Sequence, residues 1–204
     1  MKPRTPGFWL IVATVGLLAL LPMQAFAGMT PEEVKMFTET KAKAEKGEKG
    51  DPVAQHQLGY YFSQGRGVAG SSEQAAAWFR KAAVQGYAPA QYSLGVRTFA
   101  GIGVASDQVQ AVTWYRKAAQ QGHAEAQAML GYLYAIGGNG VAKDEVEAYA
   151  YWSLGGITEQ TDFRIKLTIL VEKMSPSKIA AGQKRSKELQ KEIDANIAAK
   201  KSGK

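Results

Sequence analysis

The sequence predicts an all-α protein, a right-handed α-solenoid of helix-turn-helix repeats with a capping helix at each end. The first observation is an internal repeat, because one block of 36 residues is written three times, at residues 51–86, 87–122 and 123–158. A fixed period of this length is typical of solenoids built from identical supersecondary units. The second observation is that the 204 residues contain no cysteine. Stacked helices rather than disulfides must therefore stabilise the fold.

Residues 1–27 have the pattern of a secretory signal peptide, with a basic start, an apolar run and the small-residue cleavage signal Ala25-Phe26-Ala27. An uncleaved membrane anchor is the alternative. The apolar run, Phe8–Leu21, has only 14 residues, whereas a helix needs about 20 to span a bilayer. We therefore expect cleavage near Ala27, a periplasmic or secreted mature protein, and no integral membrane span after cleavage.

Residues 28–50 are predicted to form an N-terminal capping helix. Thr30 is a typical N-cap residue, Pro31 suits the first turn, and two glutamates follow it. The helix is expected to reach about Lys46, with an apolar stripe made of Val34, Phe37 and Ala44. A terminal repeat otherwise leaves apolar surface exposed, so we expect this helix to cover the open end of the first repeat.

The first half of each unit is predicted to be a helix, because its apolar residues keep a spacing of four, as in Ala54, Leu58 and Phe62. Each of these helices contains one glycine: Gly59, Gly95 and Gly131. A glycine inside a helix costs about 1 kcal/mol against alanine. We expect the close approach of an aromatic side chain from the neighbouring helix to offset this cost. A hinge or a ligand contact would not recur in every unit.

The second half of each unit opens with a capping-box pattern, in which a capping side chain is followed three places later by an amide or an acid. The three pairs are Ser71–Gln74, Asp107–Gln110 and Asp144–Glu147. Gly86 and Gly122 are expected to end the second helix, since glycine accepts the left-handed conformation there. Each unit is therefore predicted to be an antiparallel helix pair.

Six aromatic residues recur at the period of the fold. They are Trp78, Phe79, Trp114, Tyr115, Tyr151 and Trp152. We interpret them as core residues rather than as a stacking platform for bases or sugars, because large aromatic side chains are mostly buried.

Three motifs carry a family resemblance: A-x-A-Q-x-x-L-G, then G-x-G-V, then W-[FY]-R-K-A-A-x-Q-G. They resemble the Sel-one-like repeat, a relative of the TPR helix-turn-helix repeat, from Gly47 to Gly156. The third copy departs from the pattern with SLGG at residues 153–156 in place of RKAA. The resemblance implies a non-enzymatic interaction scaffold, since bacterial members act as adaptors in the cell envelope.

Residues 159–204 are predicted to close the array. Residues 163–174 are expected to form an amphipathic half-repeat, and Ser175-Pro176 to begin a final helix. Residues 178–204 hold eight basic and three acidic side chains, whereas residues 28–177 hold 15 of each. We expect these charges to form a solvated helix face; weak contact with an anionic surface such as lipid is the alternative. Export argues against a nucleic-acid partner.

The sequence predicts no catalytic residue, no metal site and no cofactor. It contains no G-x-S-x-G, H-E-x-x-H or phosphate-binding-loop motif. A metal site needs three or four converging ligands, and the two histidines, His56 and His123, lie in different columns of the repeat. The acidic group at residues 144–147 is explained by its place at a helix start.

The surface that the repeat does not require is predicted to bind another protein of the cell envelope. The first helices of related repeats line a concave face that receives partners, and aromatic and arginine residues are favoured anchors. The candidates are Gln57, Tyr61, Arg97, Met129 and Leu133, with Tyr60 and Tyr132 as weaker candidates. The rivals are an anionic-lipid binder and a cell-wall or antibiotic hydrolase of the kind linked to cysteine-rich relatives. The absence of cysteine and of a nucleophile–base pair disfavours the hydrolase.

Overall fold

The computed structural model describes residues 29–138, 140–155 and 161–203. The predicted signal peptide and its cleavage site lie outside these residues. Within the described ranges the chain forms helices and turns, with one isolated backbone bridge between Gly138 and Val141 and no strand. The prediction of an all-α fold is confirmed.

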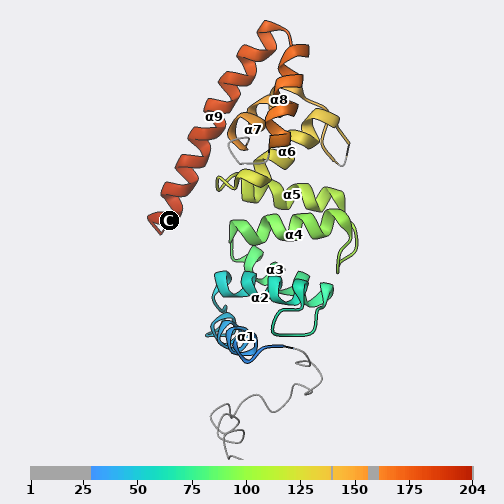
Figure 1. Ribbon diagram of the computed structural model, residues 1–204. Coiled ribbons are helices and arrows are strands. Elements are labelled where there is room, and N and C mark those ends of the chain that lie inside the picture. Colours follow the sequence, from blue (N-terminus) through green and yellow to red (C-terminus); the bar gives the residue numbers. More distant parts are fainter. Residues whose placement is uncertain (1–28, 139, 156–160, 204) are drawn as a thin grey trace, which may run out of the picture.

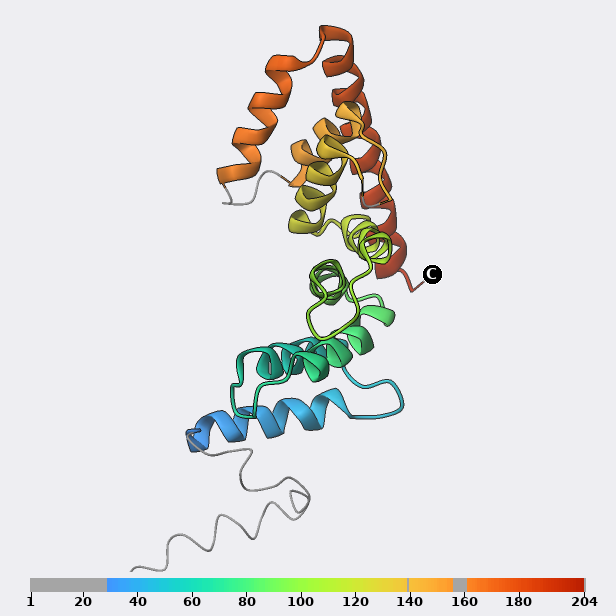
Figure 2. The same cartoon turned by 90° about the vertical axis from the view of Figure 1, so that its right-hand side faces the viewer.

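The described part of the chain forms nine helices. They are α1 (Pro31–Ala44), α2 (Pro52–Gln64), α3 (Ser72–Val84), α4 (Ala88–Ala100), α5 (Gln108–Ala119), α6 (Ala124–Ile136), α7 (Glu145–Gly155), α8 (Thr161–Lys173) and α9 (Pro176–Lys201). The predicted pairs α2/α3, α4/α5 and α6/α7 pack together, and successive pairs meet through α3 with α4 and α5 with α6. Figures 1 and 2 show the pairs stacked one on the next, with α1 at one end.

Helix α1 covers the first repeat. Its N-terminus has a complete capping box, because Thr30 Oγ1 accepts from the Glu33 amide and the Glu33 carboxylate accepts from the Thr30 amide at 3.0 Å. Phe37 of α1 is 2% exposed and packs edge-on against Phe62, with ring centroids 5.7 Å apart. The predicted apolar stripe therefore seals the end of the stack.

The second helices begin at the predicted residues, but the capping differs from the predicted box. Each capping side chain accepts a hydrogen bond from the amide three residues later, as expected. The amide of each capping residue, however, donates at 2.8–2.9 Å to a carbonyl at the end of the first helix of the same unit. These bonds run from Ser71 to Phe62, from Asp107 to Thr98 and from Asp144 to Tyr134. The turn itself satisfies the donor that the box would have served.

The second helices of the first two repeats end at Gly86 and Gly122, whose φ angles are 83° and 82°. The amide of Gly86 donates to the Ala83 carbonyl, and the amide of Tyr87 donates to the Ala82 carbonyl. The same pair of bonds recurs around Gly122. This is the Schellman ending, in which a left-handed glycine lets two late carbonyls find donors.

The glycine inside each first helix is a seat for an aromatic ring. A Cβ atom added at Gly59 would lie 2.5 Å from the Phe79 ring, and one at Gly95 would lie 2.7 Å from the Tyr115 ring. Gly131 faces Trp152 in the same way. The predicted close approach is confirmed in all three pairs, and it sets the spacing of the two helices in each unit.

A buried glutamine joins each unit to the one before it. Gln91 and Gln127 are each 4% exposed. Their side-chain amides donate to main-chain carbonyls at the end of the preceding helix pair, and Gln55 does the same to the end of α1. These bonds run from Gln55 to Ala44, from Gln91 to Ala83 and from Gln127 to Ala119. The column therefore fixes the register of successive units.

The aromatic stripe divides into two columns. The inner column, Phe79, Tyr115 and Trp152, is at most 3% exposed, and the Trp152 indole donates to the Ala128 carbonyl at 3.0 Å. Trp78 and Trp114 are only half-buried against the core. Lysine ammonium groups lie over both indoles, Lys81 over Trp78 and Lys117 over Trp114. The core interpretation holds for the inner column and for Tyr151, which is 9% exposed, whereas the two indoles lie at the boundary with solvent.

The last two helices extend beyond the repeat. Helix α8 packs on α7 but leaves Ile165 and Ile169 about half exposed. Helix α9 turns back and runs along the side of the stack, so that its C-terminal end lies near α4 (Figures 1 and 2). Leu189 and Ile193 of α9 are buried. Helix α9 thus does more than close the last repeat, because it reaches back to the earlier ones.

None of the described helices is both long and apolar enough to cross a membrane.

Candidate protein-binding face

Two of the predicted partner-binding residues lie in the core. Tyr61 is 8% exposed, with its ring against Phe37 of α1, and its hydroxyl accepts a hydrogen bond from Gln57 at 3.0 Å. Leu133 is fully buried in the cluster that joins the second and third units. Their assignment to a binding surface is corrected. Neither side chain can meet a partner without opening the stack.

The other five predicted residues lie at the surface or at its edge. Gln57 and Tyr60 are exposed, and Arg97, Met129 and Tyr132 are half-buried. We call these five residues of α2, α4 and α6 the first-helix face. Tyr60 and Tyr132, the weaker candidates in the sequence, are thus more accessible than Tyr61 and Leu133.

Histidine and tyrosine rings connect the helices beside this face. His56 of α2 lies 3.2 Å from the Ser93 hydroxyl of α4 through Nε2, and its ring meets Tyr60 edge-on with centroids 4.8 Å apart. Tyr92 of α4 stacks on His123, the residue that precedes α6, at 5.0 Å. Residues from different columns of the repeat therefore meet across the unit junctions, which the period alone does not reveal.

Both histidines are held in the neutral form. Burial and, to a smaller extent, the nearby His123 lower the pKa of His56 to about 4. Burial also lowers the pKa of His123, against the opposing effect of the Glu125 carboxylate 3.3 Å from Nδ1. Among the described residues there is no group of three histidine, cysteine, aspartate or glutamate side chains that could hold a metal ion. The His56 ring is placed for packing and hydrogen bonding, and the His123 ring for packing.

Arg97 is the charged residue of the first-helix face. Its guanidinium lies over the Phe79 ring, with Cζ 5.2 Å from the centroid. Burial lowers the pKa of this guanidinium from its usual value, while Tyr60 acts in the opposite direction. Nη1 is buried and has no hydrogen-bond partner. Arg97 is therefore the candidate on this face for a charge-assisted hydrogen bond with a partner.

Helix α8 limits the face at the third unit. Lys166 of α8 lies over the Tyr132 ring, with its ammonium 4.9 Å from the centroid. Tyr132 is therefore shared between the face and the C-terminal helices. The most accessible residues of the face are Gln57 and Tyr60, and Arg97 lies close to Tyr60.

The basic residues of α9 are partly engaged with the body of the protein. Lys178 pairs with Glu145 at 2.6 Å and Arg185 with Glu147 at 2.7 Å. Lys200 donates to the Gly86 carbonyl at 3.0 Å. These three cations hold the helix in place, which leaves fewer of its charges for the solvated face and for any anionic surface.

The repeat family is identified by comparison with family models. Sel1 repeats match residues 52–87, 88–123 and 124–155, which together are half of the chain. The chain belongs to the Sel1 repeat family. Sel1 repeat proteins are in general protein–protein interaction scaffolds and typically not enzymes. The three matched segments agree with the three helix pairs of the structure.

Two solved structures of Sel1 repeat proteins are similar to this one. One is a protective antigen of uropathogenic Escherichia coli strains with an SLR fold, at 31% identity and a TM-score of 0.65 over 83% of this chain. The match takes in only 35% of that antigen, so this chain spans about a third of its length. The other is a Sel1 repeat protein from Oxalobacter formigenes, at 33% identity and a TM-score of 0.58, over 66% of this chain and 98% of the other. A search of curated proteins gives no match.

Proposed function

We propose that this protein is a non-enzymatic scaffold of the bacterial cell envelope that holds a partner protein on its first-helix face. The family's general role in protein–protein interaction supports partner binding. The envelope location rests on the signal-peptide pattern of residues 1–27. The binding face rests on the geometry around Arg97.

The observation that carries the proposal is the unused donor of Arg97. A buried donor without an acceptor costs about 1–3 kcal/mol, and Nη1 of Arg97 is such a donor. The exposed Tyr60 lies close enough to the Arg97 guanidinium to oppose the lowering of its pKa by burial, and arginine and tyrosine are among the residues enriched in interface anchors. A partner carboxylate or carbonyl that meets the guanidinium as the side chain turns outward would remove this cost.

The test is site-specific photo-crosslinking in living cells. A photoreactive phenylalanine analogue at Tyr60 should capture the same protein as the analogue at Met129. Arg97→Ala should reduce that capture about tenfold, the loss that a single anchor of about 1.4 kcal/mol gives. Circular dichroism of the variant should be unchanged.

The control is the same analogue at Gln74, which is exposed on α3, outside the face. Capture at Gln74 equal to that at Tyr60, or capture indifferent to Arg97→Ala, would overturn the proposal. Turnover of peptidoglycan by the purified protein would favour the hydrolase instead. The predicted location is tested by mass spectrometry of the mature protein, which should begin at Gly28.

A further inference from the structure

Two successive junctions in the stack are built from equivalent residues. The junction between α1 and the first repeat contains Gly50, Gln55 and Gln85. The junction between the first and second repeats contains Gly86, Gln91 and Gln121, each 36 residues later. Both glycines have positive φ angles, 71° and 83°. In both junctions the later glutamine donates to the earlier one at 2.8 Å.

The chain itself occupies part of the second of these junctions. Lys200 of α9 donates to the Gly86 carbonyl at 3.0 Å and to Gln121 Oε1 at 2.7 Å. Asn196 donates to the Gln120 carbonyl at 3.2 Å. Ile197 lines the small pocket there with Tyr87 and neighbouring residues. The end of α9 is thus a bound example of what such a junction accepts.

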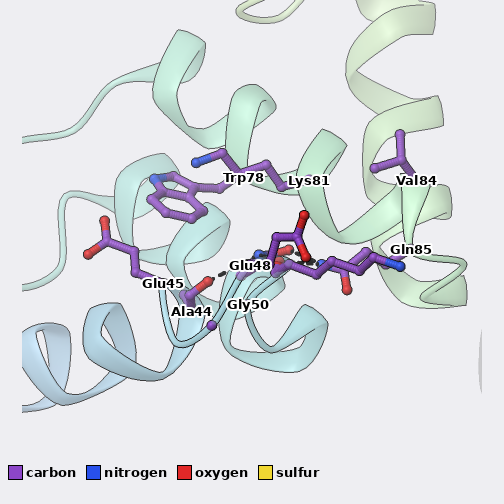
Figure 3. A pocket seen from close by; sticks show the side chains of 11 residues that line it. Ala44, Glu45, Glu48, Gly50, Trp78, Lys81, Val84 and Gln85 are labelled. Carbon is purple, nitrogen blue, oxygen red and sulfur yellow. Dashed lines mark hydrogen bonds between the residues drawn. The ribbon is translucent and has the colours of Figure 1, made fainter.

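The first junction has the same acceptors but nothing bound to them. It is an open pocket of about 800 Å³ between the α1–α2 loop and the end of α3 (Figure 3). Among the described residues, no hydrogen bond ends on the Gly50 carbonyl or on Gln85 Oε1. These two groups correspond to the two acceptors of Lys200. Val84 at the rim is 69% exposed.

The first junction also has acidic residues that the second lacks. Glu45 and Glu48 line the pocket, and the residues 36 positions later are Lys81 and Val84. Figure 3 shows both glutamates on the loop that borders the pocket, and Lys81 beside the Trp78 ring. The Lys81 ammonium lies 3.9 Å from that ring centroid. The carboxylates offset the charges of Lys49 and Lys81, so the pocket does not repel a cation.

We propose that the first junction binds a lysine side chain from the end of an amphipathic helix of a partner protein. The partner's helix would repeat the pattern of α9, with an asparagine and an isoleucine four and three residues before the lysine. Its ammonium would donate to the Gly50 carbonyl and Gln85 Oε1, and its asparagine would donate to the Val84 carbonyl, which is equivalent to the Gln120 carbonyl that Asn196 binds. A second copy of this chain is not the proposed occupant, because its own Lys200 is already bound. The pocket is separate from the first-helix face and independent of the function proposed above.

The first experiment uses a peptide with the sequence of residues 192–201, EIDANIAAKK, blocked at both ends and labelled with a fluorophore. Anisotropy with the purified full-length mature protein should show saturable binding. The same peptide with methionine at the position of Lys200 should bind about tenfold more weakly, because charge-assisted hydrogen bonds are lost. Equal binding of both peptides would overturn the proposal.

The second experiment locates the peptide. Val84→Lys should abolish binding by placing a cation at the rim, whereas Val109→Lys, at a 60% exposed valine on α5, should leave it unchanged. Glu45→Gln with Glu48→Gln removes two charges that take part in no ion pair among the described residues, and it should weaken binding severalfold. Binding indifferent to both changes would mean that the peptide displaces α9 from the second junction, against the proposal.

Sedimentation of the protein alone tests the remaining candidate occupant, a second copy of this chain. Self-association that Val84→Lys abolishes would assign the pocket to a second copy and overturn the partner assignment. Arg97→Ala should not affect peptide binding. Failure of this inference would therefore leave the first-helix face untouched.

Discussion

The side-chain amide of Gln91 donates a 3.1 Å hydrogen bond to the main-chain carbonyl of Ala83, across the junction between the first and second repeats. Gln91 Oε1 accepts at 2.8 Å from Gln121, which in turn accepts from Lys200 of α9. One buried amide therefore links the end of α3, helix α4 and the turn that follows α5. The units are held together by polar bonds as well as by apolar packing.

Gln91→Ala should destabilise the protein by about 1–3 kcal/mol, because it leaves buried polar groups at the Ala83 and Gln121 ends without their partner. Urea unfolding followed by circular dichroism measures the change. Gln74→Ala, at an exposed position, is the control and should change stability by no more than about 0.5 kcal/mol. A loss at Gln91 no larger than that of the control would show that the bond does not hold the units together.

Gly95→Ala should destabilise the protein by about 1–3 kcal/mol through overpacking, although alanine is the better helix former. The new methyl group would lie 2.7 Å from the Tyr115 ring. Thermal unfolding of Gly95→Ala, Tyr115→Leu and the double variant forms a double-mutant cycle. The double variant should be less destabilised than the sum of the single ones; strict additivity would contradict the close approach.

Stability should fall as the pH is lowered from 6.5 to about 4, in part because of His56. Its folded-state pKa of about 4 lies below the usual 6.5, so the unfolded chain takes up the proton first. The stabilisation is complete above pH 6.5 and is lost on the way down to pH 4. The lowered pKa of His123 acts in the same direction. Urea midpoints between pH 7.5 and 4 should show a smaller drop in His56→Gln, and an NMR titration giving His56 a pKa near 6.5 would exclude this explanation.

Arg185→Ala should loosen α9 from α7. Arg185 Nε donates to Glu147 at 2.7 Å and Nη1 to Glu192 at 3.2 Å, and the pKa of Arg185 is raised by these acids despite partial burial. A partly exposed pair of this kind contributes up to about 1 kcal/mol. Hydrogen exchange should become faster along α9 and stay unchanged in α2 and α3. Lys187→Ala, at an exposed residue of the same helix, should leave exchange in α9 as it is.

The repeat pattern allowed most of the fold to be predicted, because a periodic sequence marks the same element three times. The close approaches at Gly59, Gly95 and Gly131 and the helix ends at Gly86 and Gly122 were predicted because a glycine recurs at the same position of successive units. The capping boxes were predicted only in part. The amide of Ser71 binds the Phe62 carbonyl, and such a main-chain bond leaves no trace in the choice of side chains.

The binding face was predicted less well, because its exposure depends on elements outside the repeat. Tyr61 is buried by Phe37 of α1, and Tyr132 is partly covered by Lys166 of α8. The course of α9 could not be predicted either. Its bond from Lys200 to Gly86 joins residues 114 positions apart, and no periodic signal relates them. Sequence columns describe neighbours within the array and not the helices that cross it.

Helix α9 spans a fixed length of the array. Its two ends are fixed by Lys178 on Glu145 and by Lys200 on Gly86, 22 residues or about 33 Å apart at 1.5 Å per residue. Duplicating one internal repeat would carry Gly86 away from Lys200, but the junction then at the same distance would present an equivalent glycine, because Gly86 and Gly122 share one column of the repeat. The length of α9 therefore sets how many units back from α7 the helix reaches, while further units could be added beyond that point without losing either anchor.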